Sequence, residues 1–76
     1  FMKEYEIVFT YLNGCSGAAH PLTSFEEARI SSSDDYLRTK HGKDFEDFQK
    51  EIQPDNRIIY TYSNGAVTYI YEFTEI

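Results

Sequence analysis

The sequence predicts a small α+β domain of order ββ-αα-ββ, in which a four-stranded, mostly antiparallel sheet carries two helices on one face. Three observations lead to this fold class. Asn13-Gly14 and Asn64-Gly65 each join or end stretches with strand character, which indicates two β-hairpins. The region between the hairpins contains helix-start signals and apolar residues at helical spacing. A chain of 76 residues is expected to form one domain, residues 1–76.

The C-terminal hairpin spans residues 57–73, where two runs rich in Ile, Val, Thr and Tyr flank Asn64-Gly65. This dipeptide predicts a type I′ turn, because Asn and Gly tolerate the positive φ that both central residues need. Pairing across it places Arg57 opposite Glu72 and separates two faces. One face is largely aromatic and, having the larger area, is expected to pack against the helices: Ile58, Tyr60, Tyr62, Val67, Tyr69, Tyr71 and Phe73. The other is expected to face outward: Ile59, Thr61, Ser63, Ala66, Thr68 and Ile70.

The N-terminal hairpin begins with a strand over residues 3–12. Its side chains alternate with a period of two, which is typical of a half-buried strand. Tyr5, Ile7, Phe9 and Tyr11 form one side, and Val8 and Thr10 lie on the other. The return strand, Cys15 to Leu22, is predicted to be a short edge strand, since Pro21 cannot donate a ladder hydrogen bond.

The first helix is predicted to start at Thr23 or Ser24, where Glu26 or Glu27 completes a capping box. It is expected to end near His41, with Gly42 as the C′ residue. Residues 31–35 are poor helix formers and together cost about 2–3 kcal/mol relative to Ala. A break in the helix, with a serine acting as a new N-cap, is therefore the alternative.

The second helix is predicted to run from Lys43 or Asp44 to about Ile52. Phe45, Phe48 and Ile52 would form its apolar stripe at positions i, i+3 and i+7. Pro54 would stop it before the final hairpin.

Composition restricts the function classes. Seven Lys and Arg against thirteen Asp and Glu give a net charge of −6, which argues against direct nucleic-acid binding. No apolar run approaches the roughly 20 residues that span a bilayer, and no signal-peptide pattern is present, so no membrane association is expected. The single cysteine, Cys15, excludes an internal disulfide and favours a reducing compartment. We therefore expect a cytoplasmic protein, with Met2 as its natural start and Phe1 left over from an expression vector.

Catalytic and metal-binding chemistry has little support in the sequence. Cys15, His20 and His41 are the residues that resemble a nucleophile, a base or soft metal ligands, but they form no recognisable motif. We predict that the chain is not an enzyme and has no catalytic residue, metal or cofactor. A minimal enzyme that uses Cys15 and His20 is the least favoured alternative.

Two surfaces are candidates for binding a partner protein. Asp44, Asp47 and Glu51 are spaced i, i+3 and i+7 on the predicted second helix, and Asp55 continues this acidic strip. The strip would span about 10 Å and suit a basic surface such as that of a nucleic-acid-binding protein; the alternative is an ordinary solvated helix face. The second candidate is the outer sheet face, which we define by Val8, Thr10, Ile59, Thr61, Thr68 and Ile70. An apolar exposed face of this kind suits a partner or a second copy of the chain.

The sequence therefore predicts a small, acidic, non-enzymatic protein–protein interaction module. Its composition is similar to that of accessory or inhibitor proteins, including those with which phages block nucleic-acid-binding host defences. The alternative function is a structural homodimer that assembles through its exposed sheet face or an edge strand.

Overall fold

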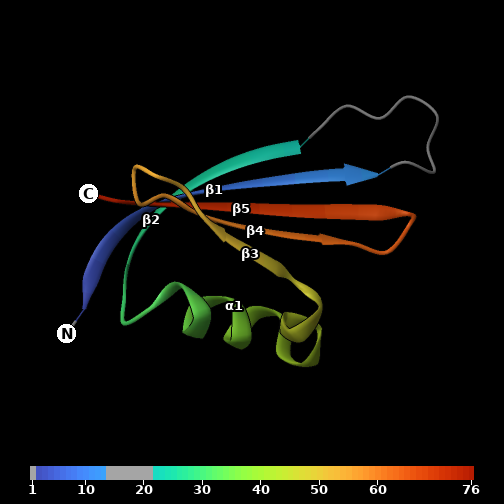
Figure 1. Cartoon of the computed structure of the whole chain (residues 1–76), viewed down its shortest axis with the longest axis horizontal. Helices are drawn as coiled ribbons and strands as arrows, with labels where there is room; N and C mark the ends of the chain where they lie inside the picture. The colour runs from blue at the N-terminus through green and yellow to red at the C-terminus, as the bar shows by residue number, and fades with distance from the viewer. Residues whose placement is uncertain (1, 14–21) are drawn as a thin grey trace.

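The computed structural model describes residues 2–13 and 22–76, which form one antiparallel sheet with a helical segment on one face (Figure 1). The elements in chain order are β1 (Lys3–Asn13), β2 (Leu22–Ile30), α1 (Ser33–His41), the 3₁₀ helix η2 (Gly42–Asp47), β3 (Gln49–Ile52), β4 (Ile58–Ser63) and β5 (Val67–Glu75). The five strands lie in the order β2-β1-β5-β4-β3. The α+β class is correct, but the predicted order ββ-αα-ββ, with four strands and two helices, is wrong.

The largest correction concerns residues 22–30, which form an edge strand instead of the start of a helix. Every residue of β2 has a partner on β1, from Leu22 opposite Tyr11 to Ile30 opposite Lys3. β1 is central in the sheet, with β5 on its other side, so β2 satisfies backbone groups that would otherwise form an open edge. This long-range pairing overrides the local capping-box signal. Leu22 is the one residue of the predicted return strand that lies inside the described part of the chain.

The α-helix begins where the sequence is poor in helix formers. Ser32 is its N-cap, and the Ser32 hydroxyl accepts a hydrogen bond of 3.1 Å from the backbone N–H of Asp35. A serine therefore acts as the N-cap, as in the alternative, but no helix precedes it: residues 22–30 form a strand, so α1 begins here and does not restart. The predicted C-terminal end is confirmed: α1 ends at His41, and Gly42 has φ +59° and donates its N–H to the carbonyl of Arg38.

The predicted second helix is also wrong. Gly42–Asp47 forms a 3₁₀ helix, and Gln49–Ile52 forms β3, which pairs with β4. Phe45 and Phe48 still pack against the core from this shorter segment. Ile52, which would complete a buried helical stripe, is 62% exposed. Pairing as a strand gives the backbone of β4 a partner on its second side, which a helix could not supply.

The C-terminal hairpin is confirmed, but its turn and register differ from the prediction. Gly65 has φ +87° whereas Asn64 has a negative φ, so Gly65 and Ala66 are the central residues, with the signs of a type II′ turn. The Asn64 side-chain oxygen accepts hydrogen bonds from the N–H groups of Ala66 and Val67.

The altered turn shifts the pairing by two residues. Glu72 lies opposite Ile59 instead of Arg57, although the Arg57 guanidinium still reaches the Glu72 carboxylate at 3.2 Å. Because strand side chains alternate with a period of two, a two-residue shift leaves every side chain on its predicted face.

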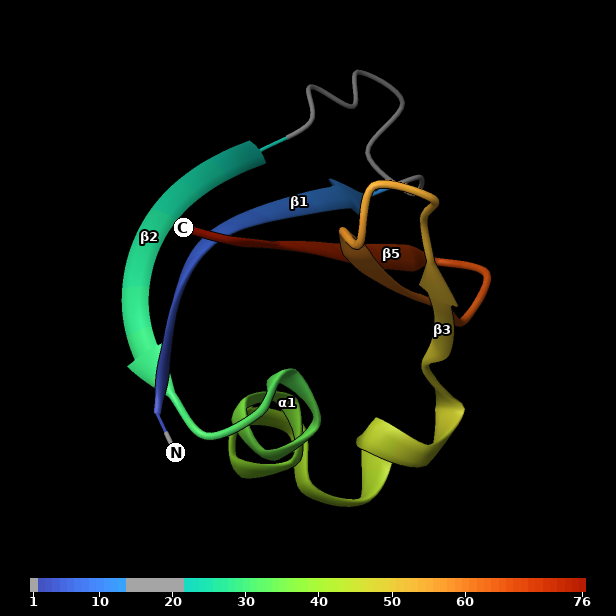
Figure 2. The ribbon, with the colours of Figure 1, turned by 60° about the vertical axis from the view of Figure 1, so that its left-hand side comes forward.

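The core lies between α1 and the aromatic face of the sheet, as predicted for that face. Its buried side chains are Tyr5, Ile7, Leu37, Tyr60, Tyr71 and Phe73. Phe73 receives edge-on contacts from Tyr5 and Tyr60, with ring centroids 6.0 Å and 5.5 Å away. Figure 2 shows the sheet curving over α1, so no described helix covers its opposite face.

A buried hydrogen-bond network joins the first turn of α1 to β4. The Tyr60 hydroxyl donates to the Asp34 carboxylate and lies 2.7 Å from the hydroxyl of buried Ser33. The Lys50 ammonium, on β3, lies 3.3 Å from the same carboxylate. Burial and the neighbouring Asp34 carboxylate raise the pKa of Tyr60, while the Tyr60 hydrogen bond lowers the pKa of Asp34. Both groups therefore keep the protonation states that this network needs over a wide pH range.

We expect Tyr60→Phe to lower the free energy of unfolding by about 1–3 kcal/mol, because it removes a buried hydrogen-bond partner from Ser33 and Asp34. Urea denaturation of the variant and the wild type measures this change. Tyr62→Phe is the matched control, since the Tyr62 hydroxyl makes no hydrogen bond within the described part of the chain. Equal losses in the two variants would contradict the anchoring role of Tyr60.

Candidate interaction surfaces

The outer sheet face forms one continuous surface, and all six residues that define it lie together. Ile70 lies directly between Thr10 and Thr61 on the neighbouring strands. Val8 and Ile59 lie on either side of Glu72, and Thr68 lies opposite Leu12 and Ser63. The six residues are half-buried. The centre of this face therefore consists of aliphatic and hydroxyl side chains, together with Glu72, which is ion-paired with Arg57.

Acidic residues dominate the charges on the outer sheet face. Its two arginines are already ion-paired: Arg57 with Glu72, and Arg29 with Glu4 at 4.0 Å. The remaining acids, Glu6, Glu27 and Glu51, make no ion pair with any residue in the two described segments. Glu6 and Glu27 lie directly opposite each other on β1 and β2. The face thus has an excess of negative charge around its aliphatic and hydroxyl side chains.

The four residues of the predicted acidic strip do not form one row, because the helix that would align them is absent. Asp44 and Asp47 belong to η2, which follows α1 on the covered side of the sheet. Glu51 lies on β3 opposite Ile59, on the outer sheet face. Asp55 lies in the connection between β3 and β4.

Asp55 nevertheless adjoins the outer sheet face through Arg57. The Arg57 guanidinium lies 2.8 Å from the Asp55 carboxylate and also binds Glu72. A hydrogen bond from the backbone N–H of Arg57 lowers the pKa of Asp55, and the guanidinium acts in the same direction. Glu51 and Asp55 thus border the outer sheet face, whereas Asp44 and Asp47 are separated from it.

The residues considered for catalysis are not assembled into a site in the described structure. Cys15 and His20 lie outside the described residues. The Nε2 atom of His41 lies 2.7 Å from the Tyr71 hydroxyl, and its ring packs against Phe48 and Tyr69 at centroid distances of 5.0 Å and 5.7 Å. No three His, Cys, Asp or Glu side chains in residues 2–13 and 22–76 converge as metal ligands. His41 therefore acts as a packed residue that joins the end of α1 to the sheet.

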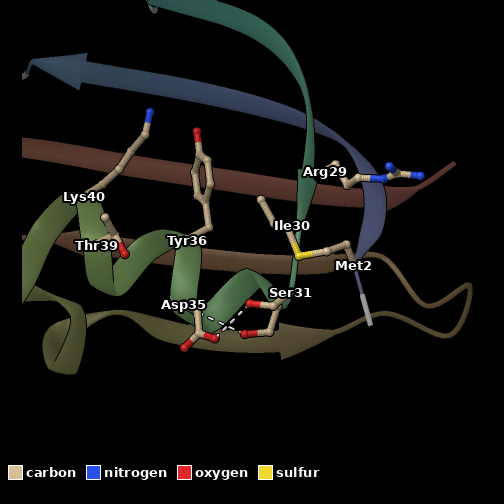
Figure 3. Close-up of a pocket in the computed structure, with 9 residues that line it drawn as sticks. Met2, Arg29, Ile30, Ser31, Asp35, Tyr36, Thr39 and Lys40 are labelled. Atoms are coloured by element: carbon tan, nitrogen blue, oxygen red, sulfur yellow. Dashed lines mark hydrogen bonds between the residues drawn. The ribbon is translucent and has the colours of Figure 1, made fainter.

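An open cavity of about 330 Å³ lies between α1 and the C-terminal end of β2 (Figure 3). Met2 and Ile30 line one end, and Tyr36 and Lys40 line the other. The Lys40 ammonium lies 4.8 Å from the centroid of the Tyr36 ring and 3.9 Å from Glu26, which also accepts a hydrogen bond from the Tyr36 hydroxyl. These polar groups bind one another, so the cavity does not present them to a ligand.

Sequence reasoning missed the exposed edge strand β2. Phe25 is 73% exposed and Leu22 is 67% exposed, and Phe25 lies in the segment that was predicted to start a helix. Phe25 lies opposite Val8 on β1, so it extends the outer sheet face to the edge. Residues 23–28 show no alternation of apolar and polar side chains, so the local sequence contained no clear signal for this strand.

No protein-family model matches the chain, and no curated protein or solved structure is significantly similar to it. Within the described residues, α1 and η2 are both too short and too polar to cross a membrane.

We expect the free energy of unfolding to fall as the pH decreases below about 6.5, in part because of His41. Burial lowers the pKa of His41 in the folded chain, so above pH 6.5 the neutral ring contributes fully to the free energy of unfolding. At lower pH the unfolded chain binds the proton more readily than the folded chain, and this contribution is lost. Titration of His41 alone changes the free energy of unfolding by at most about 1.4 kcal/mol per pH unit.

Urea denaturation between pH 7.5 and pH 5 measures this effect, and His41→Gln should reduce the pH dependence in that window. The lowered pKa of Asp34 affects the free energy of unfolding only at pH values below about 3.8, the ordinary pKa of Asp. This range lies outside the window of the measurement. An unchanged pH dependence in the His41 variant would contradict the assignment.

Proposed function

We propose that the chain is a non-enzymatic interaction module that docks on a basic surface of a partner protein through its outer sheet face. The observation that carries this proposal is a sheet face that no described helix covers, with aliphatic and hydroxyl side chains at its centre and an excess of acids around them. Among the described elements, α1 protects one side of the sheet, and no other described helix lies over the opposite side (Figure 2).

The chemistry of this face favours a protein over other partners. Nucleic acid is disfavoured, because the two arginines of the face are already paired with acids and the other charges there are negative. Aliphatic side chains such as Val8, Ile59 and Ile70 can be desolvated by a complementary protein surface. Glu6, Glu27 and Glu51 would then accelerate association with a partner of opposite charge.

The partner surface that best complements this arrangement combines apolar residues with Lys and Arg, as nucleic-acid-binding proteins do. Occupying such a surface would block access to nucleic acid, which supports an inhibitory or accessory role. Glu51 and Asp55 belong to the proposed docking surface because they border the outer sheet face. Asp44 and Asp47 do not, since they lie on η2.

The central test uses Ile70→Lys, which adds a long charged side chain between Thr10 and Thr61. A photo-crosslinking residue at Thr61 would identify the partner in an extract of the source cells, and the purified pair would then be measured by calorimetry. We expect Ile70→Lys to weaken binding at least tenfold. Thr39→Lys, an equal charge change on exposed α1, should leave it unchanged. Equal affinities for the wild type and Ile70→Lys would refute docking through this face.

A pair of charge reversals separates the outer sheet face from the 3₁₀ segment. Glu51→Lys should slow association and reduce its salt sensitivity, because it removes a negative charge beside Ile59. Asp44→Lys makes the same change on η2 and should leave the association rate nearly unaltered. Stopped-flow mixing at several salt concentrations measures both rates. The opposite ranking would assign docking to η2.

A further inference from the structure

The outer edge of β2 is the longest unpaired strand edge of the described sheet. β2 has nine residues and forms backbone hydrogen bonds on one side only, with β1. The opposite edge strand, β3, has only four residues. A long edge with exposed apolar residues is a template for pairing with another chain. Phe25 and Leu22, both largely exposed, give β2 this property.

We propose that two copies of the chain pair antiparallel along their β2 edges, about a two-fold axis at Phe25. The two Phe25 side chains then lie opposite each other on the outer sheet face. On that face Thr23 lies opposite Glu27 of the second copy, and on the other face Ser24 lies opposite Glu26 of the second copy. Two five-stranded sheets become one continuous sheet, and the β2 edge of each copy gains a backbone hydrogen-bonding partner.

The sequence of β2 selects this register among the symmetric ones. An axis at Glu26 or Glu27 would place two carboxylates directly opposite each other, which is destabilising. An axis at Ser24 pairs only residues 22–26, and an axis at Ala28 pairs only residues 26–30. The axis at Phe25 pairs residues 22–28, sets an aromatic pair at the centre and places each glutamate opposite a hydroxyl side chain.

The negative charge of each copy determines how the stability of this dimer depends on salt concentration. Each copy carries a net charge of −6, and the two Glu26 side chains lie on a diagonal across the junction. Salt screens this repulsion, so the dimer is expected to strengthen as ionic strength rises. Binding of a basic partner should weaken under the same change. The two associations are therefore distinguishable, and the dimer does not depend on the function proposed above.

The first experiment tests the register by disulfide formation in a Cys15→Ser background. Opposed residues in an antiparallel pair have Cα atoms about 4.5–5.5 Å apart, within the range that a disulfide spans. Phe25→Cys should therefore form a covalent dimer under mild oxidation. Thr23→Cys, on the same face of β2 but off the axis, should do so much more slowly. Equal rates would overturn the register, and efficient cross-linking of Ala28→Cys instead would move the axis to Ala28.

The second experiment measures the mass of the full chain by sedimentation equilibrium at low and high salt. The wild type should dimerise more tightly at high salt, and Phe25→Lys should weaken the dimer at least tenfold. Ile52→Lys is the control, because Ile52 is 62% exposed on the opposite edge strand. A monomer under all conditions, or an equal dissociation constant for Phe25→Lys, would overturn the proposal. Neither result would affect partner binding through the outer sheet face.

Discussion

The attachment of one helix to one face of the sheet is the constraint on which the rest of the structure depends. Leu37 is fully buried against the aromatic face, and the Tyr60 hydroxyl binds Ser33 and Asp34 in the first turn of α1. These contacts fix where the helix starts and which strands it crosses. Residues 2–13 and 22–76 supply one α-helix for five strands, so within these residues the helix that protects one face leaves the other without a covering element.

Much of the fold was predictable wherever a strand alternates with a clear period. The period-two patterns of residues 3–12 and 57–73 assigned the faces correctly, including all six residues of the outer sheet face. The wrong turn type predicted at Asn64-Gly65 did not affect the assignment of the faces, because a register shift of two residues leaves each side chain on the same face. Gly42 ended the helix as predicted, because a positive φ after a helix strongly favours glycine.

The failures arose where a local signal competed with a long-range one. The hydroxyl and carboxylate spacing between Thr23 and Glu26 fits a helix start, but pairing with β1 decides the conformation, and that contact is invisible in the local sequence. The spacing of Phe45, Phe48 and Ile52 likewise fits a helix as well as a 3₁₀ turn followed by a strand. The prediction of the acidic strip required that helix, so its four residues lie apart in the structure. The prediction of the outer sheet face required only the alternation of side chains along strands.

The charges of the outer sheet face are difficult to explain by folding alone. Glu6 and Glu27, directly opposite on neighbouring strands, repel each other, which destabilises the pairing of β1 with β2. A lysine at either position would remove this cost, and the two arginines of the face neutralise other acids instead. Folding does not require this cost, and the same carboxylates would attract a basic partner of the kind that we propose.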